Sequence, residues 1–396
     1  MSGSVVIIGG GQAGAQLALS LRQGGHTGAI ALIGDEPYLP YQRPPLSKKF
    51  LAEYRDPQSL FLRPESFWRE HAVALDLGQA VGSVEPRNRR IVLVSGREIA
   101  YDTLVFATGT VARTLPVPGV ELTGVFTLRR IDDVVRLRPA LTRAERVVIV
   151  GGGYIGLEVA AVVRSEGRSV TVLEAEDRVL KRVAGPTTSA FFDQHHRQHG
   201  VSIRLDARLV AIEGETHVSG VRVAPEKSIG ADLVLVATGS RAQDDLARAA
   251  GLACQDGILV DEFARTDAPD VYAIGDCTRF PSARYGRAHR LESVQNAIDQ
   301  AKAAAASILG RPQPYDPVPW FWSDQYDIKL QIAGLADDHE TAHAVGDVEG
   351  AHFSVEYRRS GRLIAVDAVN DARAHMMARR RIAEETAVVP VDVNPR

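Results

Sequence analysis

The sequence is poor in cysteine, with only Cys254 and Cys277 among 396 residues. The two cysteines stand far apart and form neither a Cys-x-x-Cys pair nor a metal-ligand cluster. This spacing argues against a disulfide framework, a paired-thiol redox centre and a cysteine metal site. We therefore expect two ordinary reduced thiols and no metal centre.

Long apolar runs are also missing, since no stretch approaches the roughly 18 residues of a membrane span. The formal net charge of -3 favours neither nucleic acid nor an anionic membrane as a partner. The opening residues SVVIIGGG lack a basic segment and a cleavage site, and they fit a first β-strand better than a signal peptide. These absences predict a cytoplasmic protein, and the length of 396 residues predicts two or three domains.

Glycine, by contrast, is placed with a clear pattern near the N-terminus. Gly9, Gly11 and Gly14 form G-x-G-x-x-G between a β-branched run and a helix-like stretch. Such glycines permit a tight turn, close approach of the backbone to a pyrophosphate, and close helix–strand packing. The next expected strand, AIALIGDE, brings Asp35 and Glu36 to the spacing at which an acid binds a ribose hydroxyl.

The same pattern recurs in the middle of the chain. Gly151, Gly153 and Gly156 follow a second β-branched run, and the strand SVTVLE ends at Glu174. Each glycine loop is followed later by a strand that closes on Ala-Thr-Gly, in YDTLVFATGT (101–110) and ADLVLVATGS (231–240). Two duplicated dinucleotide-binding α/β folds are the simplest interpretation, one for FAD and one for a nicotinamide nucleotide.

The acid at Glu174 bears on the choice of nicotinamide nucleotide. A carboxylate there accepts hydrogen bonds from both ribose hydroxyls of NADH and repels the 2′-phosphate of NADPH. Basic residues follow at Arg178, Lys181 and Arg182, so NADPH stays open, although NADH is favoured.

With these motifs in place, the chain resembles the FAD-dependent, NADH-linked ferredoxin reductases of bacterial oxygenase systems. The segments that carry the resemblance are VVIIGGGQAG, PPLSK, VFATGT, VVIVGGGYIGLEVAA, VYAIGDC, RLESVQNAIDQA and WFWSDQYDIKLQIAG, in that order and over nearly the whole chain.

The resemblance implies a glutathione-reductase-like α/β fold with two Rossmann-like domains and a C-terminal α/β domain. It implies a discontinuous FAD-binding domain at 1–112 and 245–318, an inserted NADH-binding domain at 113–244, and an interface domain at 319–396.

The resemblance also implies a reaction. NADH would give a hydride to N5 of FAD, and the electrons would then pass one at a time to a [2Fe–2S] ferredoxin that serves a haem monooxygenase or a ring-hydroxylating dioxygenase. Two alternatives stay open: a rubredoxin reductase, and a redox-sensing flavoprotein similar to apoptosis-inducing factor.

The segment YQRPPLSKKF carries the strongest mechanistic hint. Related disulfide reductases have a cysteine pair in this region and related peroxidases a single cysteine, whereas here there is none. In the family the PPLSK lysine, here Lys48, lies beside the flavin and pairs with a glutamate, here Glu158. These two are the expected catalytic residues. Without the resemblance, Lys48 fits a solvated surface lysine, and Glu158 fits an acid favoured by the dipole in the first turn of a helix.

The motifs and the resemblance together give two sets of cofactor-binding residues. The expected FAD set is Gly9, Gly11, Gln12, Ala13, Gly14, Asp35, Glu36, Arg43, Pro44, Lys48, Val81, Ala107, Thr108, Gly109, Arg129, Asp276, Ser293, Val294 and Trp320. The expected NADH set is Gly151, Gly153, Tyr154, Ile155, Gly156, Glu158, Glu174, Arg182, Gly239 and Glu292.

Two of these assignments depend on local structure. A helix is expected to open at about Ser293 or Val294 and to turn its free N–H groups toward the flavin. From composition alone the aromatic run Trp320, Phe321 and Trp322 fits a protein core, whereas the resemblance places it against the flavin.

The expected partner is an acidic ferredoxin, because electrostatic complementarity accelerates encounter. A candidate docking patch follows from four arginines within about a dozen residues, namely Arg279, Arg284, Arg287 and Arg290. The segment MMARRRIAEE, with Arg379, Arg380 and Arg381, instead fits a helix whose acids balance its own bases. The family resemblance favours a monomer.

Overall fold

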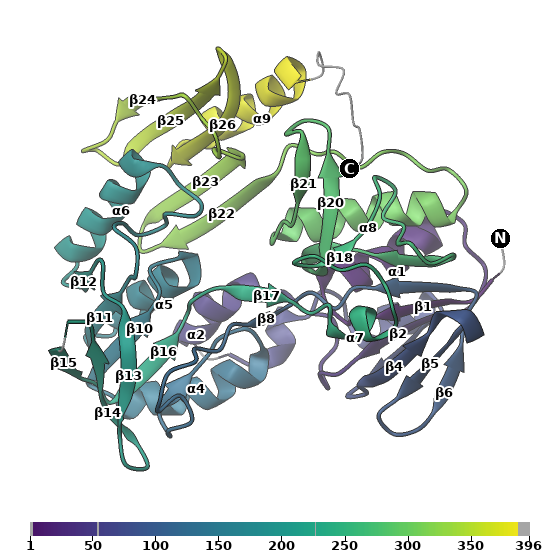
Figure 1. Ribbon diagram of the computed structural model, residues 1–396, viewed down its shortest axis with the longest axis horizontal. Coiled ribbons are helices and arrows are strands. Elements are labelled where there is room, and N and C mark those ends of the chain that lie inside the picture. Colours follow the sequence, from purple (N-terminus) through teal and green to yellow (C-terminus); the bar gives the residue numbers. More distant parts are fainter. Residues whose placement is uncertain (1–2, 54, 226, 387–396) are drawn as a thin grey trace.

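The computed structural model describes residues 3–53, 55–225 and 227–386. Three groups of elements can be followed in Figure 1: a first α/β part, a second α/β part built on the same plan, and a C-terminal sheet with one long helix.

The first part is built on a parallel sheet whose central strand, VVII, is buried at every residue. Such an unbroken apolar strand is typical of a sheet covered on both faces. Strand β19 (Val271–Ala273) pairs with β7 (Thr103–Phe106), so segments far apart in sequence share one sheet. The sheet order is β19 (Val271–Ala273), β7 (Thr103–Phe106), β1 (Val5–Ile8), β2 (Ile30–Gly34) and β3 (Val73–Leu77).

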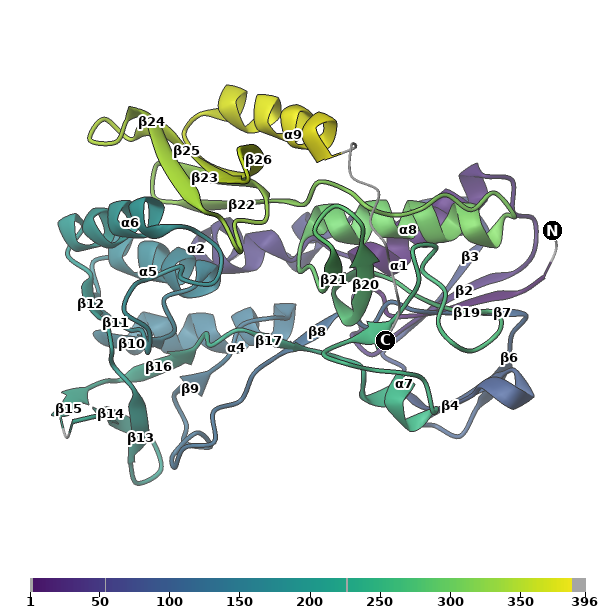
Figure 2. The ribbon, with the colours of Figure 1, turned by 45° about the horizontal axis from the view of Figure 1, so that its top comes forward.

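Two helices of this part lie side by side, as Figure 2 shows for α1 (Gln12–Gln23) and α8 (Val294–Ile308). Small buried residues of α8, including Ala297 and Ala301, allow the close contact.

Helix α8 begins at Val294, with Ser293 as its cap, which confirms the predicted start. The smaller elements are α2 (Lys49–Glu53), α3 (Glu65–Glu70), α7 (Asp245–Ala249), the sheet of β4 (Val81–Glu85), β5 (Arg90–Leu93) and β6 (Glu98–Ala100), and the sheet of β18 (Ile258–Leu259), β20 (Thr278–Ser282) and β21 (Arg287–His289).

The second part repeats the plan of the first, which confirms the predicted duplication. Its central strand β10 pairs in parallel with the strand after the second glycine loop and with the strand that precedes the second Ala-Thr-Gly. The sheet order is β12 (Ser202–Arg204), β11 (Ser169–Leu173), β10 (Arg146–Val150), β16 (Leu233–Val236) and β9 (Val125–Phe126), with helices α4 (Ile131–Arg143), α5 (Tyr154–Ser165) and α6 (Pro186–Gln198) and the small sheet β13 (Leu209–Gly214), β14 (Val218–Val223) and β15 (Lys227–Gly230).

The two α/β parts are joined by an antiparallel pair of short strands, β8 (Thr110–Ala112) and β17 (Ser240–Ala242). The C-terminal part is an antiparallel sheet with α9 (Ala372–Thr386) packed on it. Its order is β22 (Trp320–Gln325), β23 (Ile328–Gly334), β26 (Arg362–Val369), β25 (His352–Arg359) and β24 (Thr341–Asp347).

The C-terminal sheet lies against helix α6 of the second part. Phe191 of α6 meets Phe353 of β25 edge to face, with ring centroids 5.2 Å apart. At the start of α6, the N–H of Gly185 donates to Asp367 Oδ2 at 3.3 Å, and the hydroxyl of Tyr357 donates to the same oxygen at 2.6 Å. Since Asp367 has no exposed surface, burial raises its pKa to about 6.

This buried carboxyl makes stability depend on pH. Its folded-state pKa lies above the ordinary value of 3.8, so its contribution to stability is fully present below that value and is lost as pH rises through about 6. We predict that Asp367→Asn, which keeps the acceptor oxygen without the charge, gains about 2–3 kcal/mol in unfolding free energy relative to the wild type between pH 4 and pH 7.

Equilibrium urea unfolding at a series of pH values measures this difference. Asp347→Asn, which removes an exposed carboxylate from the same sheet, is the matched control. A difference between Asp367→Asn and wild type that stays constant with pH, or that Asp347→Asn reproduces, would contradict the prediction.

Candidate functional site

A cavity of about 820 Å³ lies where the three parts of the chain meet. The first part supplies residues of the first glycine loop, of the PPLSK segment and of the start of α8. The second part supplies the start of α5 and the loop before α6, and the third supplies the aromatic run of β22. We call it the central cavity. From the predicted sets it is lined by Gly9, Gly11, Gln12, Ala13, Asp35, Glu36, Arg43, Pro44, Lys48, Ala107, Thr108, Gly109, Arg129, Tyr154, Ile155, Glu158, Arg182, Asp276, Glu292, Ser293, Val294 and Trp320.

Two glycines of the first glycine loop have opposite surroundings. Gly9 has φ of +123°, and a Cβ on it would lie 2.1 Å from the carbonyl oxygen of Ala107. A Cβ on Gly11, in contrast, would meet no atom within 4 Å, so this residue leaves open space at the N-terminus of α1. No side chain caps that helix, and its first N–H groups are therefore free for an anion.

The second glycine loop reproduces this arrangement. Gly151 has φ of +111° and lies against Ala237, where a Cβ would come within 2.4 Å of the carbonyl oxygen. Gly153 has open space around its Cβ position, and no side chain caps α5. Both loops thus combine a backbone contact that only glycine permits with an open helix N-terminus, which fits a dinucleotide pyrophosphate at each.

Beside the first loop, acids and arginines hold one another in place. Glu36 accepts from Tyr41 at 2.6 Å and from Arg43 at 2.7 Å. Arg129 pairs with Asp276 at 3.0 Å. Burial raises the pKa of Asp276, against the opposing effect of Arg129.

At the middle of the cavity the expected ion pair is present, with Lys48 Nζ 2.7 Å from Glu158 Oε1. Glu158 is only 3% exposed, so its carboxylate depends on these partners. Two serines also donate to it: Ser47 to Oε2 at 2.5 Å and Ser323 to Oε1 at 2.6 Å. The four residues come from all three parts of the chain.

Neither serine was singled out from sequence, although each lies inside a quoted motif, Ser47 in PPLSK and Ser323 in WFWSDQ. The signal that could have found them is chemical. A glutamate facing the interior needs more donors than one lysine, and hydroxyls next to the expected lysine and aromatic residues are the nearest candidates.

The aromatic run of β22 is half-buried and lines the cavity, so the core interpretation from composition is wrong. Tyr154, the first residue of α5, lies over Phe321 with ring centroids 4.3 Å apart. Trp320 has two neighbours from α9: the guanidinium of Arg379 lies 4.9 Å from its ring centroid, and the ring of His375 lies 5.7 Å away, edge to face.

Seven predicted residues do not line the central cavity, and they stay predictions: Val81, Gly14, Gly151, Gly153, Gly156, Glu174 and Gly239. Val81 begins β4 and pairs with Leu93 in the small sheet. Glu174 follows β11 and accepts from the N–H of Gly152 at 2.7 Å, which places its carboxylate against the second glycine loop.

Three of the four arginines of the candidate docking patch lie beside acids from other segments of the chain. Arg287 pairs with Asp337 and Asp338, and Arg290 with Asp256 and Glu292. The backbone N–H of Arg284 donates to Asp316. The charges of Arg287 and Arg290 are therefore balanced locally. In the C-terminal segment Arg380 and Arg381 pair with Glu384 and Glu385 one turn on, as predicted, whereas Arg379 lies over the ring of Trp320 instead.

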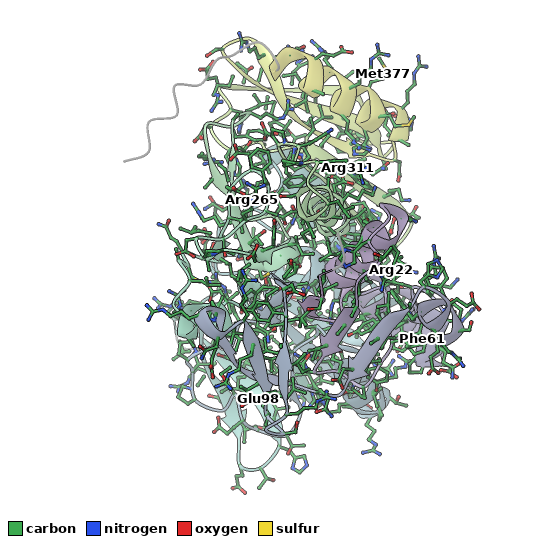
Figure 3. All side chains as sticks on the ribbon, turned by 90° about the vertical axis from the view of Figure 1, so that its right-hand side faces the viewer. Arg22, Phe61, Glu98, Arg265, Arg311 and Met377 are labelled. Atoms are coloured by element: carbon green, nitrogen blue, oxygen red, sulfur yellow. The ribbon has the colours of Figure 1, made fainter. Side chains whose placement is uncertain are left out.

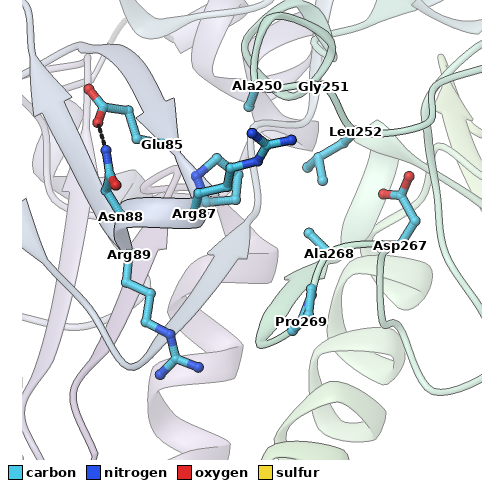
Figure 4. A pocket seen from close by; sticks show the side chains of 11 residues that line it. Glu85, Arg87, Asn88, Arg89, Ala250, Gly251, Leu252, Asp267, Ala268 and Pro269 are labelled. Carbon is cyan, nitrogen blue, oxygen red and sulfur yellow. Dashed lines mark hydrogen bonds between the residues drawn. The ribbon is translucent and has the colours of Figure 1, made fainter.

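A second hollow of about 780 Å³ lies between the β4–β5 turn and the end of α7 (Figure 4). Arg87 points into it, opposite Leu252 and Asp267. None of the predicted site residues lines it, so it is not part of the candidate site.

Over the described ranges, 3–53, 55–225 and 227–386, no cluster of three or more histidines, cysteines or carboxylates is arranged to hold a metal ion. Within the same ranges no helix is long and apolar enough to cross a bilayer.

Comparisons with known proteins agree with this geometry. The family model described as pyridine nucleotide-disulphide oxidoreductase matches residues 3–301, and the model described as reductase C-terminal matches residues 320–394. The ferredoxin reductase subunit of a 5,5′-dehydrodivanillate O-demethylase from Sphingobium is 45% identical, over 97% of this chain and 94% of that one.

Solved structures give the same result. The ferredoxin reductase for the CYP199A2 system of Rhodopseudomonas palustris has a TM-score of 0.95 and 42% identity, covering 97% of this chain and 95% of that one. The putidaredoxin reductase in a covalent complex with putidaredoxin has a TM-score of 0.93 and 37% identity, covering 97% and 93%. With matches of this extent, the chain belongs to the ferredoxin reductases of the pyridine nucleotide-disulphide oxidoreductase family.

Proposed function

We propose that the protein is an NADH:ferredoxin oxidoreductase that binds FAD in the central cavity and serves an oxygenase. The observation that carries the proposal is the ion pair between Lys48 and Glu158, in a cavity that the first glycine loop and the start of α5 both line. No cysteine lines that cavity: Cys277 is fully buried, where burial raises its pKa, and Cys254 lies elsewhere. A thiol relay is therefore not part of the mechanism.

The residues present fit FAD. The open space at Gly11 and the uncapped N-terminus of α1 suit its pyrophosphate, and Glu36 stands at the end of the neighbouring strand for a ribose. Asp276 and the start of α8, at Ser293 and Val294, would complete the site. When bound, the flavin supplies the conversion between the two-electron chemistry of NADH and single-electron transfer to an iron–sulfur acceptor.

The chain's own residues hold the charges of the site. The ammonium of Lys48 lies 2.7 Å from the carboxylate of Glu158. The pair therefore places a local dipole in the cavity without adding net charge. The N-terminus of α8, where Ser293 accepts from the N–H of Asn296, supplies a positive dipole end at the cavity wall. Trp320, Phe321 and Tyr154 exclude water from the side that faces the second and third parts.

NADH is preferred over NADPH because two of the three nearby basic residues are occupied. Arg178 donates to the carbonyl of Ala184, and Lys181 pairs with Glu176. Neither is free for a 2′-phosphate, and Glu174 would repel it. Arg182, which lines the cavity, is left for the pyrophosphate side of NADH.

The sheet membership supports the domain division proposed from sequence. Residues 1–112 and 245–318 form the FAD-binding domain, 113–244 the NADH-binding domain and 319–396 the interface domain. The enzyme is expected to act as a monomer in the cytoplasm, the compartment in which thiols such as Cys254 stay reduced.

The partner in this proposal is an acidic [2Fe–2S] ferredoxin that docks beside Trp320. The candidate patch of Arg279, Arg284, Arg287 and Arg290 supplies the surface on one side, although acids pair with two of these arginines, Arg287 and Arg290. On the other side α9 adds Arg373 and Arg379, for which no carboxylate partner is found among the described residues. Met376 and Met377 are exposed on the same helix, and Met377 stands out from its surface in Figure 3.

The whole proposal is tested by anaerobic stopped-flow spectroscopy of the FAD-loaded protein. We expect NADH to bleach the flavin at least ~10-fold faster than NADPH, and the reduced enzyme to reduce a [2Fe–2S] ferredoxin of the same genome. Transfer to rubredoxin alone would establish a rubredoxin reductase instead. Slow transfer to every acceptor, with NADH-dependent oligomerisation, would indicate a redox sensor.

The two open glycines separate the two nucleotide sites. A Val side chain at Gly11 or Gly153 meets no protein atom at its Cβ, so both variants should fold. We predict that Gly11→Val loses at least ~90% of its bound FAD, whereas Gly153→Val stays yellow and needs at least ~10-fold more NADH for half-maximal bleaching. Flavin absorbance and an NADH titration measure both effects. Equal loss of FAD in the two variants would contradict the assignment of the loops.

Docking is tested by charge reversal. Arg379→Glu should lower kcat/KM for ferredoxin about 10-fold at low salt and less at high salt, with unchanged flavin reduction by NADH, because it changes encounter and not hydride transfer. Arg287→Glu should have a smaller effect, since Arg287 already faces two acids. Arg208→Glu, at an exposed arginine between β12 and β13, is the matched control. An equal loss in the control would refute docking at this face.

A further inference from the structure

A chain of buried hydrogen bonds runs from Glu158 into the C-terminal sheet and on to helix α6. Ser323 donates to Glu158 Oε1 at 2.6 Å, and Gln325 Nε2 donates to Ser323 Oγ at 3.1 Å. The amide oxygen Oε1 of Gln325 then lies 2.8 Å from Nε2 of His196. Ser323, Gln325 and His196 are each no more than 1% exposed.

All three hydrogen bonds point in one direction. The amide oxygen of Gln325 can only accept, so Nε2 of His196 carries the proton and donates. The amide nitrogen of Gln325 can only donate, and the hydroxyl of Ser323 therefore gives its own proton to the carboxylate. The chain thus requires a proton on Nε2 of His196, and the buried Nδ1, which has no hydrogen-bond partner among the described residues, fits the neutral Nε2–H tautomer. Burial lowers the pKa of His196 to about 4, which is consistent with a neutral ring at physiological pH.

We propose that Ser323 and Gln325, with His196 behind them, are positioning residues that fix the carboxylate of Glu158 and through it the ammonium of Lys48. This inference rests on the proposed function, because it assigns these residues a part in hydride transfer at the Lys48 end of the cavity. It also gives the C-terminal domain a direct role in that transfer, since β22 supplies both Ser323 and Gln325.

The chain is a positioning device and not a route for protons. Passage of a proton through Gln325 would require the amide to change its tautomer, and Nδ1 of His196 is buried with no hydrogen-bond partner among the described residues. A fixed row of donors has a different effect: it leaves Oε1 of Glu158 one orientation in which both Lys48 and Ser323 are satisfied. Loss of one donor allows the carboxylate to rotate, and a misplacement of this kind costs about 10- to 100-fold in rate.

The first test uses Ser323→Ala and Gln325→Met, which remove one link each with little change in volume. Ser354→Ala is the control, because Ser354 is a buried serine in the same sheet that does not contact Glu158. With equal FAD content, we expect both test variants to lower the limiting rate of flavin reduction by NADH at least ~10-fold. The NADH concentration at half-saturation should stay within about twofold, and Ser354→Ala should match the wild type.

The second test measures the protonation of His196, the far end of the hydrogen-bond chain, without catalytic turnover. In ¹⁵N-histidine NMR of the FAD-loaded protein, with the His196 signals assigned by His196→Gln, we expect Nε2 protonated, Nδ1 unprotonated and no titration between pH 8 and pH 5.5. Gln325→Met should shift the Nε2 signal because its acceptor is gone, and Ser354→Ala should leave it in place.

The outcomes separate this inference from the proposed function. A wild type that NADH cannot reduce overturns the proposed function, whatever the NMR shows. A wild type that is reduced normally while Ser323→Ala and Gln325→Met behave as Ser354→Ala overturns the positioning role alone. Protonation of His196 at Nδ1 instead of Nε2 overturns the direction of the chain, and with it the inference.

Discussion

The interaction on which the rest of the structure depends is the satisfaction of one buried carboxylate. Glu158 is 3% exposed, and an isolated charge at such depth would cost several kcal/mol. Its donors are Ser47 and Lys48 of the first part and Ser323 of the third, while Glu158 itself belongs to the second. The charge is satisfied only when all three parts are closed on one another, so the central cavity and the domain arrangement are two consequences of the same requirement.

The two glycine loops have a different role: they leave space for a ligand at a helix N-terminus, and they do not hold the three parts of the chain together. Gly9 and Gly151 have positive φ and lie against a carbonyl oxygen, which fixes each loop on its sheet. Gly11 and Gly153 leave their space empty. Duplication of this device gives two anion sites at helix N-termini, and the start of α5 brings the second loop to the wall of the cavity at Tyr154 and Ile155.

Much of this arrangement follows from local sequence. The glycine spacing, the two Ala-Thr-Gly strands and the start of α8 are patterns within short windows, and short-range sterics decide them. The ion pair between Lys48 and Glu158 came from the family resemblance. The hydroxyls on Glu158 lie 111 and 165 residues away in sequence, and no periodicity reports such a contact. The ion pairs of the arginine patch could not be predicted for the same reason, because Asp337 and Asp256 come from distant loops that fold beside it.

No cysteine lines the cavity, and this bears on how electrons would leave it. In the proposed function, electrons that cannot move to a protein sulfur leave through the edge of the cavity, which favours an edge that is thin and still excludes water. Half-buried Trp320 lines the cavity, and the guanidinium of Arg379 lies 4.9 Å from its ring centroid. The same strand carries Ser323 three residues on. The proposed exit for electrons and the proposed donor that orients Glu158 thus belong to one short strand. On these two proposals, a shift of β22 would alter hydride transfer and electron exit together.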